Sequence, residues 1–393
     1  MGLFFLALLA AMPLLAQHDM STMNMPGMDM TNMKMDNAGP NGMLSLKAKG
    51  WDFSFHGTLR VIDVQQSGPV GGDKLFSTSH FMVAASHALA GGTFTVIGTF
   101  SLDPATITKR EYPELFQTGE TAFGKPIVDG QHPHNFFTET ALRYSHPLTD
   151  KSTWEIYVAP VGDPALGPTA YPHRASAAEL ADAPLGHHLQ DSTHISYEVV
   201  TGGLKRGMFH LEASGFHGAE PGENRWIIGY GPIDSYSARL TISPTDNWSG
   251  QVSAGHITKP EALEPESQVR TTASITYRRP RLAASAIWGR VHELGTPVNL
   301  NSYGLEGVAR FLTRNYFTGR IELVDKDELL VAGHYRIGAY TTGYVRDFYV
   351  IPGISTGVGA NFTTYSTPEA LHSTYGTHPV AVIMFMRFKL RDY

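Results

Sequence analysis

The chain has 393 residues, a formal net charge of −6, 17% charged residues and no cysteine. The negative charge, without a long Lys/Arg run, argues against nucleic-acid binding, and the lack of cysteine excludes disulfides and thiolate metal sites. Beyond the N-terminus no apolar stretch reaches the roughly 20 residues of a membrane helix, whereas 40 Gly, 17 Tyr and 20 Phe suit strands, tight turns and interfacial aromatic residues.

Residues 1–16, MGLFFLALLAAMPLLA, form an apolar run with the length of a signal peptide. We expect cleavage near Ala16, although the run carries no basic residue and has Leu14 where a small residue is usual. The alternative is a buried strand or helix of the mature fold. A signal peptide would direct the protein across the inner membrane.

Residues 17–43 are of low complexity and too polar to bury a core, so we expect a disordered segment. Methionine recurs in a five-residue repeat, and thioether sulfur is a soft ligand that prefers Cu(I) or Ag(I). An interaction tail, an oxidation sink and no role at all are the alternatives. The candidate ligands in this segment are His18, Met20, Met23, Met25, Met28, Met30, Met33 and Met35.

From Trp51 onward, apolar and polar residues alternate with a period of two, which indicates half-buried strands. In segment 51–61, for example, Phe53 and Phe55 fall on one face and Ser54 and His56 on the other. The pattern returns at 193–200, 208–214, 269–278 and 316–323. Alternation alone fits either a soluble sandwich or a membrane barrel, whose polar face lines the lumen.

The connections decide between these two folds, because bacterial barrels alternate short periplasmic turns with long outer loops. We predict short turns at 91–92, 149–152, 201–204, 244–247, 279–280 and 313–315, with long connections at 67–73, 104–135, 161–190, 217–225, 258–267 and 292–300. Residues 44–393 are therefore predicted to form an antiparallel, up-and-down transmembrane β-barrel of about 16 strands, within a range of 12 to 18. Both chain ends would lie on the periplasmic side.

Histidines cluster in and beside the two longest loops, and we treat them as candidate metal ligands. His132 and His134 are two residues apart in an extended segment, so they would point the same way. The competing interpretation, which we favour, is that these loops fold into the lumen and their polar side chains hold them there. The candidates are His132, His134, His187, His188 and His194.

The lumen is predicted to carry His56, His80, His194 and His210, with Met82 in phase with His80. Charges of both signs on the same face would form ion pairs that brace the wall. No nucleophile motif, phosphate-binding loop or dinucleotide fingerprint is present, so we do not expect an enzyme. A serine nucleophile beside His194, such as Ser192, is the alternative.

An exported Met-rich leader from His18 to Met43, followed by barrel-like strands, resembles the outer-membrane copper-resistance B family. The resemblance implies a metal-handling protein of the bacterial outer membrane, in contact with lipid, with its N-terminal segment in the periplasm. The Met segment would capture copper or silver, and periplasmic metal carriers or export machinery would be its partners. The alternative function is a general porin or structural barrel with loops that plug the lumen.

Overall fold

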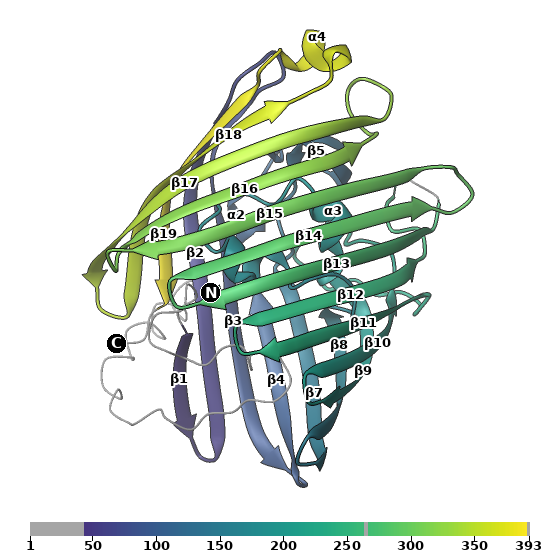
Figure 1. Ribbon diagram of the computed structural model, residues 1–393, viewed down its shortest axis with the longest axis vertical. Helices are drawn as coiled ribbons and strands as arrows, with labels where there is room; N and C mark the ends of the chain where they lie inside the picture. The colour runs from purple at the N-terminus through teal and green to yellow at the C-terminus, as the bar shows by residue number, and fades with distance from the viewer. Residues whose placement is uncertain (1–42, 263–265, 391–393) are drawn as a thin grey trace.

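The computed structural model describes residues 43–262 and 266–390. In that part, 16 antiparallel strands close into a barrel (Figure 1), which confirms the predicted fold and strand number. The wall contains β2 (Trp51–Gln66), β3 (Asp73–Leu89), β4 (Gly92–Phe100), β7 (Phe137–Thr149), β8 (Ser152–Gly162), β9 (Ser196–Arg206), β10 (Phe209–His217), β11 (Ser235–Thr245), β12 (Trp248–Ile257), β13 (Gln268–Arg279), β14 (Leu282–Glu293), β15 (Asn299–Phe311), β16 (Asn315–Lys326), β17 (Tyr335–Ile351), β18 (Ile354–Ser366) and β19 (Val380–Leu390).

The barrel closes where β19 pairs with β2, from Ala381 opposite Gln66 to Lys389 opposite Thr58. Beyond that point the free edge of β2 pairs with a short strand, β1 (Met43–Ala48). The first described residue is therefore already part of the sheet, and Met43 is buried. The expected signal peptide and nearly all of the Met-rich segment lie outside the described residues.

The alternation of the sequence becomes an inside and an outside in the wall. Leu305 and Phe317, which face outward on β15 and β16, are 54% and 55% exposed. Their neighbours Glu306 and Thr318 face inward and are buried. A closed sheet leaves no unpaired edge, and its apolar outer face with a polar inner face is the arrangement of a membrane barrel.

The connections alternate in length, as predicted. Turns of two or three residues join β3 to β4, β7 to β8, β9 to β10, β11 to β12, β13 to β14, β15 to β16 and β17 to β18 at one end, and the longer loops lie at the other. The predicted turn at 201–204 is wrong, because β9 continues to Arg206. The Gly203 that suggested a turn makes room for a side chain: a Cβ there would lie 2.7 Å from Cγ of Glu155.

The two longest loops fold into the barrel (Figure 1). Loop 101–136 contains a short helix, α2 (Asp103–Thr106), and a hairpin of β5 (Tyr112–Ala122) and β6 (Lys125–Gln131), which forms a separate sheet. Loop 163–195 contains η3 (Tyr171–His173), η4 (Ala175–Ala177), α3 (His187–Gln190) and η5 (Ser192–His194). In the described residues, no helix is long and apolar enough to cross a membrane.

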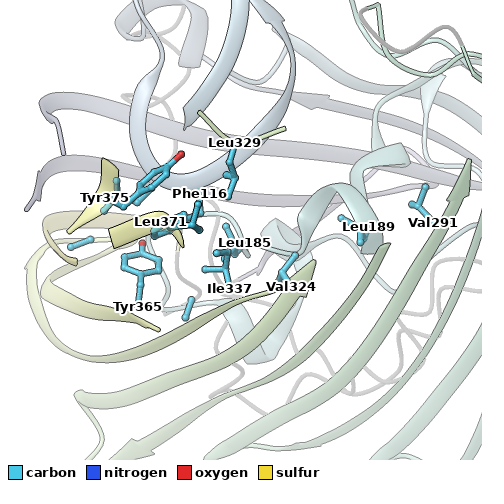
Figure 2. Close-up of a cluster of buried hydrophobic side chains, with 13 residues drawn as sticks. Phe116, Leu185, Leu189, Val291, Val324, Leu329, Ile337, Tyr365, Leu371 and Tyr375 are labelled. Atoms are coloured by element: carbon cyan, nitrogen blue, oxygen red, sulfur yellow. The ribbon is translucent and has the colours of Figure 1, made fainter. Parts of the chain in front are cut away.

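A buried apolar cluster joins the inserted loops to the wall near the long-loop end. Figure 2 shows Phe116 from the hairpin and Leu185 from loop 163–195 near Ile337 of β17, with Leu189 of the same loop on the side of Val291. Tyr375 belongs to α4 (His372–Tyr375), which follows η6 (Glu369–Leu371) in the β18–β19 connection. The hydrophobic core of this protein therefore lies partly within the barrel, between the inserted loops and the wall.

Candidate functional site

Loop 163–195 is fixed to the wall by a buried ion network. Nε of Arg174 donates to Glu306 of β15 at 2.6 Å, and Nη1 donates to Asp191 at 2.9 Å. Glu306 also accepts from Nε of Arg320 on β16 at 3.2 Å. The side chains of these four residues are 1 to 3% exposed. Charges so deeply buried are tolerated only when paired, so the network fixes the position of the loop.

A second network fixes the same loop near the closure of the barrel. Glu179 pairs with Arg387 and with Lys389, both on β19, the latter at 2.7 Å. Arg60 of β2 donates to the carbonyl of Ala178 at 2.8 Å. Earlier in the loop, Gly167 donates to Ser253 of β12. The loop thus contacts the wall from β12 round to β2 and lies across the lumen.

The inserted hairpin is held by fewer polar contacts. Gln117 accepts from Nζ of Lys326 on β16 at 3.0 Å. Within the hairpin itself, Oδ1 of Asp129 accepts from the backbone N–H of Phe116 at 2.8 Å. Phe116, Glu120 and Asp129 all have positive φ, a strained conformation for residues with a side chain. Burial raises the pKa of Asp129 to about 6.

A cavity of about 360 Å³ lies between loop 163–195 and the short-turn end of the barrel. Its lining reaches Asp246 and Asn247, which form the β11–β12 turn, so the cavity extends to that end. The predicted lumen residues all line it: His56, His80, Met82, His194 and His210. Charged lining residues of both signs include Arg60, Arg143, Arg239, Glu139, Glu155 and Glu212.

Ion pairs between neighbouring strands brace this lumen, as the sequence predicted. Arg239 of β11 donates two hydrogen bonds to Glu212 of β10, at 2.9 and 3.1 Å.

Three histidines from different segments also meet at the cavity: His80 stacks edge-on against His173, with ring centroids 4.2 Å apart, and lies 5.9 Å from His56. Burial lowers the pKa of His173 to about 4, so this ring is neutral at physiological pH.

The five loop histidines separate into two groups. His134, His187 and His194 converge, with the rings of His134 and His187 lying 5.7 and 5.3 Å from that of His194. Nδ1 of His187 lies 2.7 Å from Asp191. Burial alone would raise the pKa of Asp191, but His187 and Arg174 hold it well below its usual range. Burial lowers the pKa of His194 to about 3.

The second group surrounds Glu120 of the hairpin. Nε2 of His132 lies 2.9 Å from Oε2 of Glu120, and ligand atoms of His188, Glu120 and Glu220 lie within 4.8 Å of one another. The expected chelating pair of His132 and His134 is not formed, because His134 turns to Asp103 at 3.1 Å. Side chains two residues apart point the same way only in a regular strand. The segment with His132 and His134 is not one, because β6 ends at Gln131.

Burial raises the pKa of both carboxylates of this second group, but their neighbours shift the two pKa values in opposite directions. Burial and the neighbouring Glu120 raise the pKa of Glu220 well above its usual range. Burial alone would also raise the pKa of Glu120, but His132 and Arg225 beside it hold that pKa well below its usual range. Burial lowers the pKa of His188. The side chains of Glu120 and Glu220 also hydrogen-bond to each other.

The candidate nucleophile pair is not formed. Oγ of Ser192 accepts from Arg270 at 2.8 Å and lies 3.5 Å from Glu220, whereas Nδ1 of His194 lies 2.8 Å from the carbonyl of Asp191.

His18 and the methionines from Met20 to Met35 lie outside the described residues, so the metal-capture site expected in the Met-rich segment remains a prediction.

The sequence predicted that polar side chains of the loop hold it in the lumen, and Arg174 does so. It did not identify Glu179 or the partners on the wall, because irregular segments have no period. Glu306 and Arg320 do carry a signal, since they are direct cross-strand partners, but it appears only when the register is known.

The fold and the occupied lumen define the class: a closed, antiparallel, 16-stranded β-barrel with inserted loops. No protein-family model matches the sequence, and no curated protein matches it either. Solved structures do match, including an anion-selective porin from Comamonas acidovorans, at a TM-score of 0.56 with 12% identity over 86% of this chain and 100% of that one. Salmonella typhi OmpF, solved in complex with daunomycin, matches at 0.55 with 8% identity over 88% and 100%. The outer-membrane channel DcaP of Acinetobacter baumannii matches at 0.53 with 11% identity over 88% and 99%. At identities this low, the likeness shows a shared fold and nothing more.

Proposed function

We propose that this protein is a porin-like barrel of the bacterial outer membrane whose lumen is obstructed by its own loops. The observation that carries the proposal is the path of loop 163–195, which crosses the lumen and forms buried ion pairs with the wall at Glu306 and at Arg387. The apolar outer face supports a place in lipid. A place in the outer membrane also agrees with the apolar N-terminal run of residues 1–16.

The short turns would face the periplasm, as they do in bacterial barrels generally. In that orientation the 360 Å³ cavity forms a vestibule on the periplasmic side, and the inserted loops close it toward the exterior. The mixed charges of its lining favour small polar solutes or ions over apolar molecules. The protein then acts as a closed or narrowly conducting channel, and movement of loop 163–195 sets its conductance.

Conductance across a planar lipid bilayer tests this proposal. The refolded chain should insert and pass little current, whereas a variant with residues 168–186 replaced by a short Gly-Ser linker should conduct as an open porin does. Equal currents from the two proteins would refute obstruction by the loop. A chain that fails to insert, although its migration on a gel shifts with heating as a folded barrel's does, would refute a place in the membrane.

Copper handling is the second candidate function, and one observation favours it. Two thioethers, of Met43 and Met82, line the cavity together with His56, His80 and His173, and these are donors that bind copper. Titration of Cu(I) under anaerobic conditions into the full protein and into a version without residues 18–42, which keeps Met43, tests it. Binding that disappears with the segment supports the Met capture site; binding by both moves the site to the barrel; binding by neither refutes this candidate.

A further inference from the structure

Three potential metal ligands from three separate segments meet beside the inserted loops. Glu120 comes from strand β5 of the inserted hairpin, His188 from α3 of loop 163–195, and Glu220 from the β10–β11 connection, residues 218–234. One ligand atom from each lies within 4.8 Å of the other two. Ligand atoms on a tetrahedral zinc ion are about 3.4 Å apart, from bond lengths of about 2.1 Å. Side-chain movements of about 1 Å would therefore complete the site.

A buried polar atom without a partner points to a further ligand at this place. Nδ1 of His188 is buried and has no hydrogen-bond partner among the described residues. The carboxyl groups of Glu120 and Glu220 hydrogen-bond to each other, so a proton lies between them. The His188 side chain as a whole is only 7% exposed. Buried polar atoms are nearly always paired in folded proteins, so the unpaired nitrogen of His188 calls for a partner. A cation would bind this nitrogen and would take the place of the proton between the two carboxylates.

The carboxylates are already oriented by neighbours that are not themselves ligands. Arg225 and His132 both contact Oε2 of Glu120, at 2.7 and 2.9 Å, which leaves Oε1 for another partner. Ser192 lies 3.5 Å from Oε1 of Glu220. Such surrounding contacts are what fix the ligands of metal sites. Glu120 also adopts a positive φ of 61°, a strained conformation that is typical of functional positions.

We propose that Glu120, His188 and Glu220 bind a divalent transition-metal ion, with Zn²⁺ as the probe, and that the ion fastens the inserted loops to loop 218–234. Two carboxylates and an imidazole suit Zn²⁺. None of the three ligands is a thioether, so the set does not select Cu(I). A hydrogen bond from Gly124 at the tip of the hairpin to Glu223, at 2.9 Å, already joins the two segments there. The ion would strengthen that junction.

The barrel also contains a matched control. Glu155, His210 and Glu212 form a second cluster with ligand atoms equally close. There, however, both oxygens of Glu212 accept from Arg239, and His210 lies 3.0 Å from Glu155. A guanidinium already occupies the place of a cation, so we expect no metal at this second cluster.

Isothermal titration of Zn²⁺ into the metal-free, detergent-solubilised full chain tests the proposal. We expect one tight site, weakened at least 10-fold by Glu220→Gln and by His188→Asn and unchanged by His210→Asn. Heat-dependent gel migration verifies that each variant is a folded barrel; if His188→Asn does not fold, Glu220→Gln decides alone. Absence of tight binding by the parent chain, or equal binding by the parent and the Glu220 variant, would overturn the proposal.

The proposed fastening has its own measurement. Zn²⁺ should slow hydrogen exchange in residues 218–234 at least several-fold in the parent chain and leave exchange in the Glu220→Gln variant unchanged. Equal slowing in the two proteins would overturn the assignment of these ligands. Neither measurement involves conductance, so failure of the metal site and failure of the channel proposal give different results.

Discussion

Replacement of Arg174 by alanine tests how loop 163–195 is held in the lumen. The side chain is 3% exposed and donates to Glu306, to Asp191 and to the carbonyl of Thr169. Removal of one partner from a buried ion pair costs about 3–5 kcal/mol, because the remaining charge is left unpaired. Here Glu306 keeps Arg320 and Asp191 keeps His187, so we expect the lower end, about 3 kcal/mol. At about 1.4 kcal/mol per tenfold, the undocked population rises about a hundredfold.

Hydrogen exchange of the loop amides and single-channel conductance both measure that population. In Arg174→Ala, exchange within residues 165–190 should accelerate about a hundredfold and openings should become frequent, while exchange in the wall strands stays slow. The control is Arg336→Ala. This arginine also makes two hydrogen bonds to one carboxylate, Asp325, but it is 54% exposed, and exposed pairs contribute about 1 kcal/mol or less. Equal effects of the two substitutions would refute the argument from burial.

Three further predictions concern the wall and the hairpin. Leu305→Arg places a charge on the outer face and should lower the free energy of unfolding in lipid vesicles, measured by urea titration, by about 2–4 kcal/mol. Leu330→Arg, at an exposed loop residue, should change it by about 0.5 kcal/mol or less. Equal values would contradict a lipid-facing wall. Burial raises the pKa of Asp129 to about 6, so the docked hairpin favours the protonated carboxyl. Docking should therefore be strongest below about pH 4 and should lose up to about 3 kcal/mol of free energy as the pH rises through 6. In Asp129→Asn, hydrogen exchange of the hairpin should no longer depend on pH in this way. Gly203→Ala should lower the free energy of unfolding by about 1–3 kcal/mol, because the new Cβ would lie 2.7 Å from Glu155 of β8. Gly202→Ala should leave it unchanged, because there is open space around Gly202. Identical unfolding midpoints would refute the steric explanation.

The sequence predicts the wall well because the wall repeats one local rule. A period of two, combined with short and long connections, determines which face is apolar and where the chain turns, and neither requires knowledge of distant contacts. The rule failed at Gly203, where a glycine serves a neighbouring strand instead of a turn. Composition cannot distinguish these two uses of glycine.

The interior could be anticipated only in part. The histidine-rich loops were expected to enter the lumen, and they do, but the pairing of His134 with Asp103 and of His132 with Glu120 depends on how an irregular loop folds back on itself. Such folding has no periodic signal. The approach of Glu220 to His188 depends on a third loop in the same way. Residue types therefore suggested candidate metal ligands, but the way the histidines group with carboxylates required the structure.

The interior contains two kinds of contact with different consequences for opening. The apolar cluster around Phe116 and Leu185 gains free energy from burial in any close arrangement. The ion pairs of Arg174 and Glu179 contribute little net stability, because desolvation offsets their attraction, but they strongly penalise a misplaced loop. A loop held mainly by the first kind would settle in several positions; the second kind selects one. Opening must therefore hydrate several buried charges together, which favours discrete closed and open states over a gradual widening.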